Sequence, residues 1–182
     1  MTPAPPPSPT AELWGGALLG VVESLAAVGI TQDRVETLLT KVGIRWPDPV
    51  GWYPLTAYLG FLAAVEAHHG AEALHALGRA IPERAKFAPD LDGMERALQV
   101  LDVAYQVNHR GPILGGYHPR LVAPGQAELV CENPYPCDLD LGLLERLLER
   151  AAGGSPRASV VHRPGPACRR LGARACVFDL RW

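Results

Sequence analysis

The sequence predicts an α+β fold, in which an N-terminal helical bundle packs on a small antiparallel sheet with an inserted helix. Two observations predict it. Residues 11–110 carry apolar positions at helical spacing, whereas residues 111–182 carry short strands around one further helix. The 182 residues are 48% hydrophobic and 20% charged, which is typical of a globular domain with a sizeable core. We therefore expect a single domain over residues 11–182, preceded by a disordered Pro-rich tail over residues 1–10.

The helical part is predicted from periodicity and from its breakers. A first helix should start from an N-cap at Thr10 and run through TAELWGGALLGVVESLAAVG, and a second spans TQDRVETLLTKVG. The stretch IRWPDPVGWYP is expected to be a loop because three prolines interrupt it. Two further helices should meet at Gly70 and end at Pro82. The last helix of this part should bury one stripe of side chains, which consists of Met94, Leu98, Leu101 and Tyr105.

The sheet part is predicted from turn signals and from alternation. Two strands in RLVAPGQAELVCEN are joined by a Pro-Gly turn, and two more strands are RASVVHR and ACVFDLRW. The helix LDLGLLERLLERAAGG lies between these pairs. Asp138 and Asp140 stand at its start, where negative charge is favourable, so we interpret them as capping residues. A solvated, charged sheet edge is expected for four arginines, namely Arg163, Arg169, Arg170 and Arg174.

Several classes of function are disfavoured by composition. A net charge of −2 gives no general attraction to nucleic acid or to anionic membrane. No apolar run approaches the roughly 20 residues that span a bilayer, so membrane insertion is not expected. The opening MTPAPPPSPT lacks the basic and apolar regions of a secretory signal, and the expected location is the cytoplasm. No nucleophile–base pair or cofactor fingerprint is visible, so we do not expect an enzyme.

Four cysteines form two pairs, in CENPYPC and in CRRLGARAC. The gaps of five and seven residues are wider than the two to four that usually separate zinc ligands. Spacing therefore leaves three alternatives open, which are buried free thiols, a metal site and disulfides. A metal site would use Cys137, Cys168 and Cys176, with Cys131, His162 or Glu132 as the fourth ligand.

The C-terminal third resembles a known family. NPYPCDLDLGLLERLLE, followed by CRRLGARACVFDLRW, is similar to the vinyl-reductase-like (4-vinyl reductase) small-molecule-binding domain. That domain shares a superfamily with the heme NO-binding domains and with the TRAPP subunits of Golgi transport. More narrowly, the stretch resembles a myxobacterial-type paralogous family of unknown function related to the heme NO-binding domains. The resemblance spans about Leu98 to Trp182 and is only architectural before that. It is carried by Cys137, Gly142, Cys168, Gly172 and Cys176.

The resemblance implies a zinc site. In phenol-sensing members of the vinyl-reductase-like group, three cysteines and a glutamate hold zinc near a buried pocket for an aromatic ligand. The three cysteines match Cys137, Cys168 and Cys176, but Gly165 stands at the glutamate position. The resemblance therefore implies zinc only if His162 or Cys131 replaces the glutamate.

The same resemblance leads us to expect no heme. Heme NO-binding domains use a proximal histidine, and Tyr105 stands at that position here. Their Y-x-S-x-R motif grips the heme propionates, whereas this chain has Tyr135 followed by Cys137 and Leu139. A leucine cannot pair with a carboxylate. His109 is the nearby imidazole that would have to serve as the iron ligand.

The function expected from the sequence is a non-enzymatic sensing or adaptor domain that binds a small apolar ligand between the helices and the sheet. Its pocket should keep a cavity of roughly a few hundred cubic ångströms. The walls are expected from Trp52, Tyr58, Phe61, Leu101 and Tyr105.

The main alternative is a ligand-free interaction module like the TRAPP subunits. Such a module would form a homodimer through the N-terminal helices, where Gly15, Gly16 and Gly20 lie beside Trp14. A heme-based gas sensor is the more distant alternative.

Overall fold

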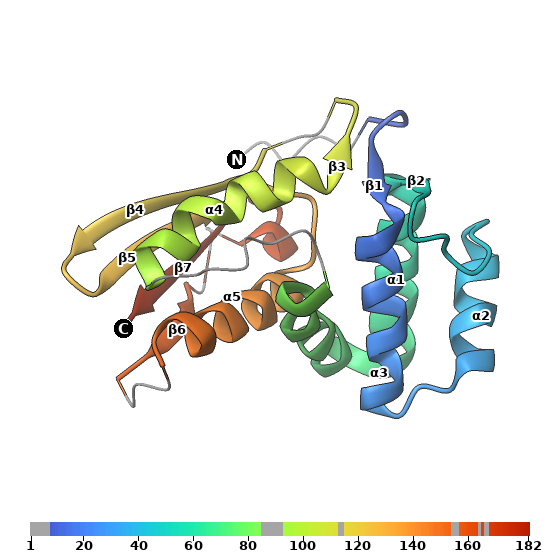
Figure 1. The fold of residues 1–182 in the computed structure, drawn as a ribbon, viewed down its shortest axis with the longest axis horizontal. Helices are drawn as coiled ribbons and strands as arrows, with labels where there is room; N and C mark the ends of the chain where they lie inside the picture. The colour runs from blue at the N-terminus through green and yellow to red at the C-terminus, as the bar shows by residue number, and fades with distance from the viewer. Residues whose placement is uncertain (1–7, 85–92, 113–114, 154–156, 164, 166–167) are drawn as a thin grey trace.

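The computed structural model describes residues 8–84, 93–112, 115–153, 157–163, 165 and 168–182. Residues 1–7 of the expected tail lie outside the described residues. Two parts lie side by side in Figure 1: the N-terminal helices, and a four-stranded sheet with two further helices. One hydrophobic core runs through both parts. The α+β class expected from the sequence is confirmed.

A short strand, not a helix, opens the described chain. β1 (Glu12–Trp14) lies between β2 (Trp52–Pro54) and β3 (His109–Arg110) in an antiparallel three-stranded sheet. The expectation of a helix from Thr10 and of a continuous loop around Trp52 is therefore wrong at these residues. The pairing joins segments that are far apart in sequence, so local periodicity does not reveal it.

The first helix, α1 (Gly15–Ser24), begins where β1 ends and continues into η1 (Leu25–Val28), a 3-10 turn. A Cβ on Gly15 would lie 2.0 Å from the carbonyl oxygen of Asp48. Only glycine allows this approach. The close contact is between the start of α1 and the segment around Asp48 of the same chain. Gly15 is therefore accounted for without a second copy of the chain.

The next helices follow the predicted pattern except at Pro82. They are α2 (Gln32–Lys41), α3 (Leu55–Arg84) and α4 (Met94–Val107). The predicted end at Pro82 is wrong, because α3 continues through Pro82 to Arg84. Gly70 has a φ of 79° inside α3 and divides it into two helical segments, as predicted. The stripe predicted for α4 is fully buried, so this amphipathic helix packs as its period indicates.

The larger sheet is antiparallel throughout. Its strand order is β4-β5-β7-β6, with β4 (Tyr117–Ala123), β5 (Gln126–Cys131), β6 (Ser159–His162) and β7 (Cys176–Arg181). Alternation in β7 is as predicted, because Phe178 and Leu180 face the core while Asp179 and Arg181 point outward.

The last helix, α5 (Cys137–Ala151), crosses α3 at very short range. A Cβ on Gly78 would lie 2.0 Å from the carbonyl oxygen of Leu139, and a Cβ on Gly142 would lie 2.0 Å from that of His75. The two glycines therefore let the helix backbones touch. This crossing determines where the first turn of α5 lies relative to the sheet.

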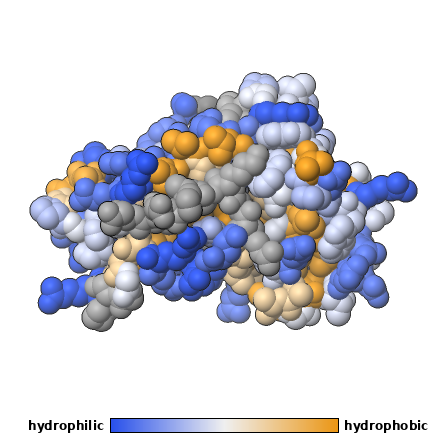
Figure 2. All heavy atoms as spheres, in the orientation of Figure 1, coloured by the Kyte–Doolittle hydropathy of each residue, from blue (hydrophilic) through white to orange (hydrophobic). Residues whose placement is uncertain are grey.

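The surface shown in Figure 2 carries hydrophobic residues in patches separated by hydrophilic ones. Exposed apolar side chains on α4 include Val103 and Val107. Scattered residues of this kind are normal on a folded domain. Among the described helices, none is both long and apolar enough to cross a membrane.

We expect Gly142→Ala to lower the free energy of unfolding by about 2 kcal/mol, because the new methyl group would overlap backbone that has no room to move. Urea denaturation measures this change. Gly60→Ala is the matched control, since the nearest atom to its Cβ is a side-chain methyl of Val42 at 3.2 Å. The control should stay within about 1 kcal/mol of wild type. Equal stability of the two variants would contradict the close crossing.

Candidate functional site

Three thiols and one imidazole meet beside the core. The Sγ atom of Cys137 lies 3.1 Å from that of Cys176 and 3.5 Å from that of Cys168. Together with a ring nitrogen of His162, the four ligand atoms all lie within 4.8 Å of one another. We call these four residues the thiol centre. All four cysteines of the chain are free, and none of these sulfur distances is that of a disulfide.

Four separate segments build the thiol centre. Cys137 is the first residue of α5, and Cys176 is the first residue of β7. Cys168 directly precedes η2 (Arg169–Leu171), a 3-10 turn. His162 ends β6 and pairs in register with Phe178, on which its ring stacks at 4.7 Å. The sheet register and the start of α5 thus place the four ligand atoms.

The electrostatics of the thiol centre favour a thiolate at Cys176 and a neutral imidazole at His162. The hydrogen bond between Cys137 and Cys176 lowers the pKa of Cys176 and raises that of Cys137. Burial lowers the pKa of His162, so its imidazole is neutral, as a metal ligand must be. The Nε2 atom of His162 is buried and has no hydrogen-bond partner among the described residues. A buried ring nitrogen of this kind is costly unless something binds it.

The structure brings some of the predicted metal ligands together and excludes one of them. Cys137, Cys168, Cys176 and His162 come together, but Cys131 does not belong to the group. Cys131 pairs with Cys176 across two strands and is fully buried, and this burial raises the pKa of its thiol. It is a core residue.

A buried ion pair lies next to the thiol centre. Arg169 donates to Asp140, and their side chains are 10% and 1% exposed. Asp140 also accepts hydrogen bonds from the hydroxyl of Tyr117 at 2.7 Å and from the amide of Asn133 at 3.2 Å. The interpretation of Asp140 as a cap and of Arg169 as part of a solvated edge is therefore wrong. Nothing in the local sequence distinguishes Arg169 from the exposed Arg170 beside it.

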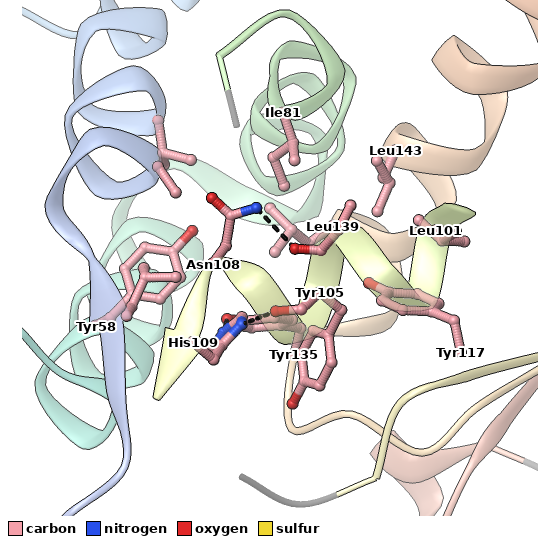
Figure 3. A pocket seen from close by; sticks show the side chains of 14 residues that line it. Tyr58, Ile81, Leu101, Tyr105, Asn108, His109, Tyr117, Tyr135, Leu139 and Leu143 are labelled. Atoms are coloured by element: carbon pink, nitrogen blue, oxygen red, sulfur yellow. Dashed lines mark hydrogen bonds between the residues drawn. The ribbon is translucent and has the colours of Figure 1, made fainter. Parts of the chain in front are cut away.

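A pocket lies among the helices α1, α3, α4 and α5, and Tyr117 of β4 in the larger sheet forms one part of its wall (Figure 3). Its cavity has a volume of about 60 Å³, which is less than the few hundred expected from the sequence. Most of the surface is apolar, with polar groups at a few points. It is lined by Leu13, Ala17, Val21, Tyr58, Ile81, Leu101, Ala104, Tyr105, Asn108, His109, Tyr117, Tyr135, Leu139 and Leu143.

His109 is held by two hydrogen bonds at the pocket wall. Its Nδ1 donates to the carbonyl oxygen of Tyr105 at 2.6 Å, and its Nε2 therefore accepts from the hydroxyl of Tyr135. Burial lowers the pKa of His109, and the bond to Tyr105 opposes this only in part. Burial also raises the pKa of Tyr58, so both groups are neutral. The hydroxyl of Tyr58 takes part in none of the hydrogen bonds between described residues, although the ring is buried.

Three of the five residues predicted to form the pocket wall do so. Tyr58, Leu101 and Tyr105 line the cavity, whereas Phe61 and Trp52 do not. Phe61 is fully buried in the core of the helical part, and Trp52 lies in β2 with the guanidinium of Arg110 over its ring. Periodicity locates buried positions but does not separate core from cavity. His109 and Tyr135, which the sequence analysis considered only in relation to heme, also line the cavity.

The fold is that of the H-NOX domains. The H-NOX domain of Shewanella oneidensis in its Fe(II)CO state is 16% identical, with a TM-score of 0.61 over 91% of this chain and 97% of that one. An oxygen-binding H-NOX domain related to soluble guanylate cyclases is 17% identical, with a TM-score of 0.58 over 92% and 93%. A third H-NOX protein, studied for heme distortion, is 17% identical, with a TM-score of 0.60 over 93% of each chain. No family model matches the chain, and no curated protein matches it.

These similarities support the heme NO-binding part of the resemblance; its vinyl-reductase and TRAPP parts stay predictions. They also contradict the expectation that heme is unlikely here, because two of the structures that share the fold are described by the distortion or the redox potential of their heme. The expectation rested on single motif positions, whereas the similarity to these proteins extends over nearly the whole chain.

The pocket offers one imidazole for a heme iron but too little space for the porphyrin. His109 would be the axial ligand, since it is a neutral imidazole in apolar surroundings. No lysine or arginine is among the described residues that line the cavity. A porphyrin is far larger than about 60 Å³, so the residues as placed here do not accommodate it. Heme would enter only if the aromatic rings that fill the pocket moved apart.

We expect the wild-type protein to lose stability as the pH falls from 7 to 5, and we expect His109→Gln to lose less stability over the same range. Since folding lowers the pKa of His109, the unfolded chain binds the proton more tightly, and acid below the ordinary pKa of about 6.5 favours unfolding. Thermal denaturation across this range, with the exposed His118→Gln as control, measures the difference. An unchanged pH dependence in His109→Gln would show that His109 does not titrate in this way.

Proposed function

We propose that this chain is a non-enzymatic sensing or adaptor domain on an H-NOX-like fold, with a structural zinc ion at the thiol centre and a small, mostly apolar ligand in the pocket. The observation that carries the proposal is the buried, unpartnered Nε2 of His162 beside three clustered thiols. The zinc part stands on this geometry. The ligand part stands on the pocket.

The donor set is that of a closed zinc site. Three cysteines and one histidine are a recurrent set for structural zinc. A Zn–S distance of about 2.3 Å places the sulfurs of a tetrahedral site about 3.8 Å apart. The observed 3.1 and 3.5 Å are close to this spacing, so a zinc ion needs only small shifts. Four protein ligands leave no open position for water, which supports a structural role over a catalytic one.

The pocket limits the ligand by size and polarity. A cavity of about 60 Å³ holds only a few heavy atoms without rearrangement. Its walls are mainly leucine, alanine and tyrosine rings, so the ligand should be uncharged. The hydroxyl of Tyr58, which takes part in no bond between described residues, offers one hydrogen bond to it.

We expect native mass spectrometry and metal analysis to find one zinc ion per chain. Cys176→Ser and His162→Ala should each lose the zinc, because each removes a ligand atom from the centre. A chelator should lower the melting temperature of wild type but not of Cys176→Ser.

Cys131→Ser is the matched control, since it is a buried cysteine one strand away that is outside the group. It should retain the zinc ion. Zinc lost equally from Cys131→Ser and Cys176→Ser, or no zinc in wild type, would contradict the proposal.

A heme-based sensor is the second candidate. It is favoured by the likeness to structures described by their heme and by His109 in the pocket. Titration of the purified chain with hemin distinguishes the two candidates. A Soret band that His109→Ala abolishes would support the heme sensor, whereas no band would favour the small apolar ligand. The homodimer and the TRAPP-like interaction module stay predictions, which light scattering would test.

A further inference from the structure

We infer that Arg169 is a positioning residue that couples metal occupancy of the thiol centre to the shape of the pocket. The inference rests on the zinc site proposed above and adds a regulatory link to it. It is carried by a continuous set of contacts from the ligand Cys168 to two tyrosines of the pocket wall.

The first step joins Arg169 to the metal ligands. Arg169 directly follows Cys168 in η2, and its backbone N–H donates to the Sγ atom of Cys176 at 3.4 Å. The sulfur atoms of Cys168 and Cys176 both belong to the thiol centre. A metal ion on these sulfurs therefore restrains the backbone of Arg169 from two sides.

The second step runs along the side chain of Arg169, which is only 10% exposed. One Nη atom donates to the carbonyl oxygen of Cys131 at 2.5 Å, and the other donates to that of Tyr135 at 2.7 Å and to Asp140. Burial disfavours the charge, but Asp140 and then Cys176 outweigh it and raise the pKa of Arg169. The guanidinium is thus charged and directed at fixed acceptors.

The third step reaches the pocket. Asp140 accepts a hydrogen bond from the hydroxyl of Tyr117, and the hydroxyl of Tyr135 donates to His109. Tyr117, Tyr135 and His109 all line the cavity. One guanidinium therefore holds two parts of the pocket wall, one through a carbonyl and one through a carboxylate.

The consequence is a linkage between two sites. Loss of the metal frees η2, and a shift of Arg169 leaves Asp140 buried with fewer partners and Tyr135 without its donor. The pocket wall then loses its fixed shape, and a preformed cavity binds more tightly than one that must be ordered. By thermodynamic reciprocity, occupancy of the pocket must also strengthen metal binding.

Xenon is a suitable probe, because it binds small apolar cavities without needing a particular functional group. We expect the xenon affinity of the full zinc-loaded chain, followed by xenon NMR, to fall about fivefold or more when a chelator removes the zinc. Arg169→Lys keeps the charge but loses the planar fork. It should retain the zinc and yet bind xenon as weakly as the metal-free wild type.

Arg170→Lys is the matched control. This neighbour is half exposed and pairs with Glu66 and Asp138, away from the pocket. It should behave as wild type in both zinc content and xenon affinity. Because zinc-loaded Arg169→Lys and Arg170→Lys are compared directly, the result does not depend on the metal-free chain remaining folded.

Two results would overturn the inference in different ways. Equal xenon affinity in zinc-loaded Arg169→Lys, Arg170→Lys and wild type would end the role of Arg169 while leaving the zinc site intact. A chain without zinc in the initial metal analysis would remove the zinc site and this coupling together. Metal analysis before xenon is added tells the two apart.

Discussion

The buried ion pair between Arg169 and Asp140 is the interaction on which much of the structure depends. Taking both charges out of water costs several kcal/mol per ion, which the mutual attraction and additional hydrogen bonds must offset. The two Nη atoms of Arg169 are hydrogen-bonded, whereas its buried Nε has no partner among the described residues. Asp140 is satisfied by Tyr117 and Asn133 as well as by the arginine. The same guanidinium holds two backbone carbonyls. The sheet, the start of α5 and the turn before β7 are therefore fixed relative to one another.

The position of α5 is the second constraint. Its glycine-mediated contact with α3 brings the two backbones together and so fixes the first turn of α5. That turn carries both Cys137, which belongs to the thiol centre, and Asp140, which belongs to the ion pair. The placement of α5 therefore affects both the thiol centre and the pocket. This shared support is what makes a link between the two sites physically reasonable.

The similarity to H-NOX domains concerns the fold, whereas function depends on the side chains inside it. At 16–17% identity the backbone arrangement is kept over nearly the whole chain. The interior at the pocket is nevertheless filled by tyrosine rings, which pack edge-on against one another and leave a small cavity. The ring of His109 lies tilted against two of them, Tyr105 and Tyr135. These rings, and how far they can separate, set the size of any molecule that the pocket could take.

The sequence by itself determined the local elements and the type of chemistry. The stripe of α4, the alternation in β7 and the kink at Gly70 follow from spacing and backbone sterics, which act over a few residues. The family resemblance selected Cys137, Cys168 and Cys176. Only the tertiary structure decided that β1 forms, that His162 rather than Cys131 joins the cysteines, and that Arg169 and Asp140 are buried. These outcomes depend on distances between segments far apart in the chain, and spacing along the sequence does not contain those distances.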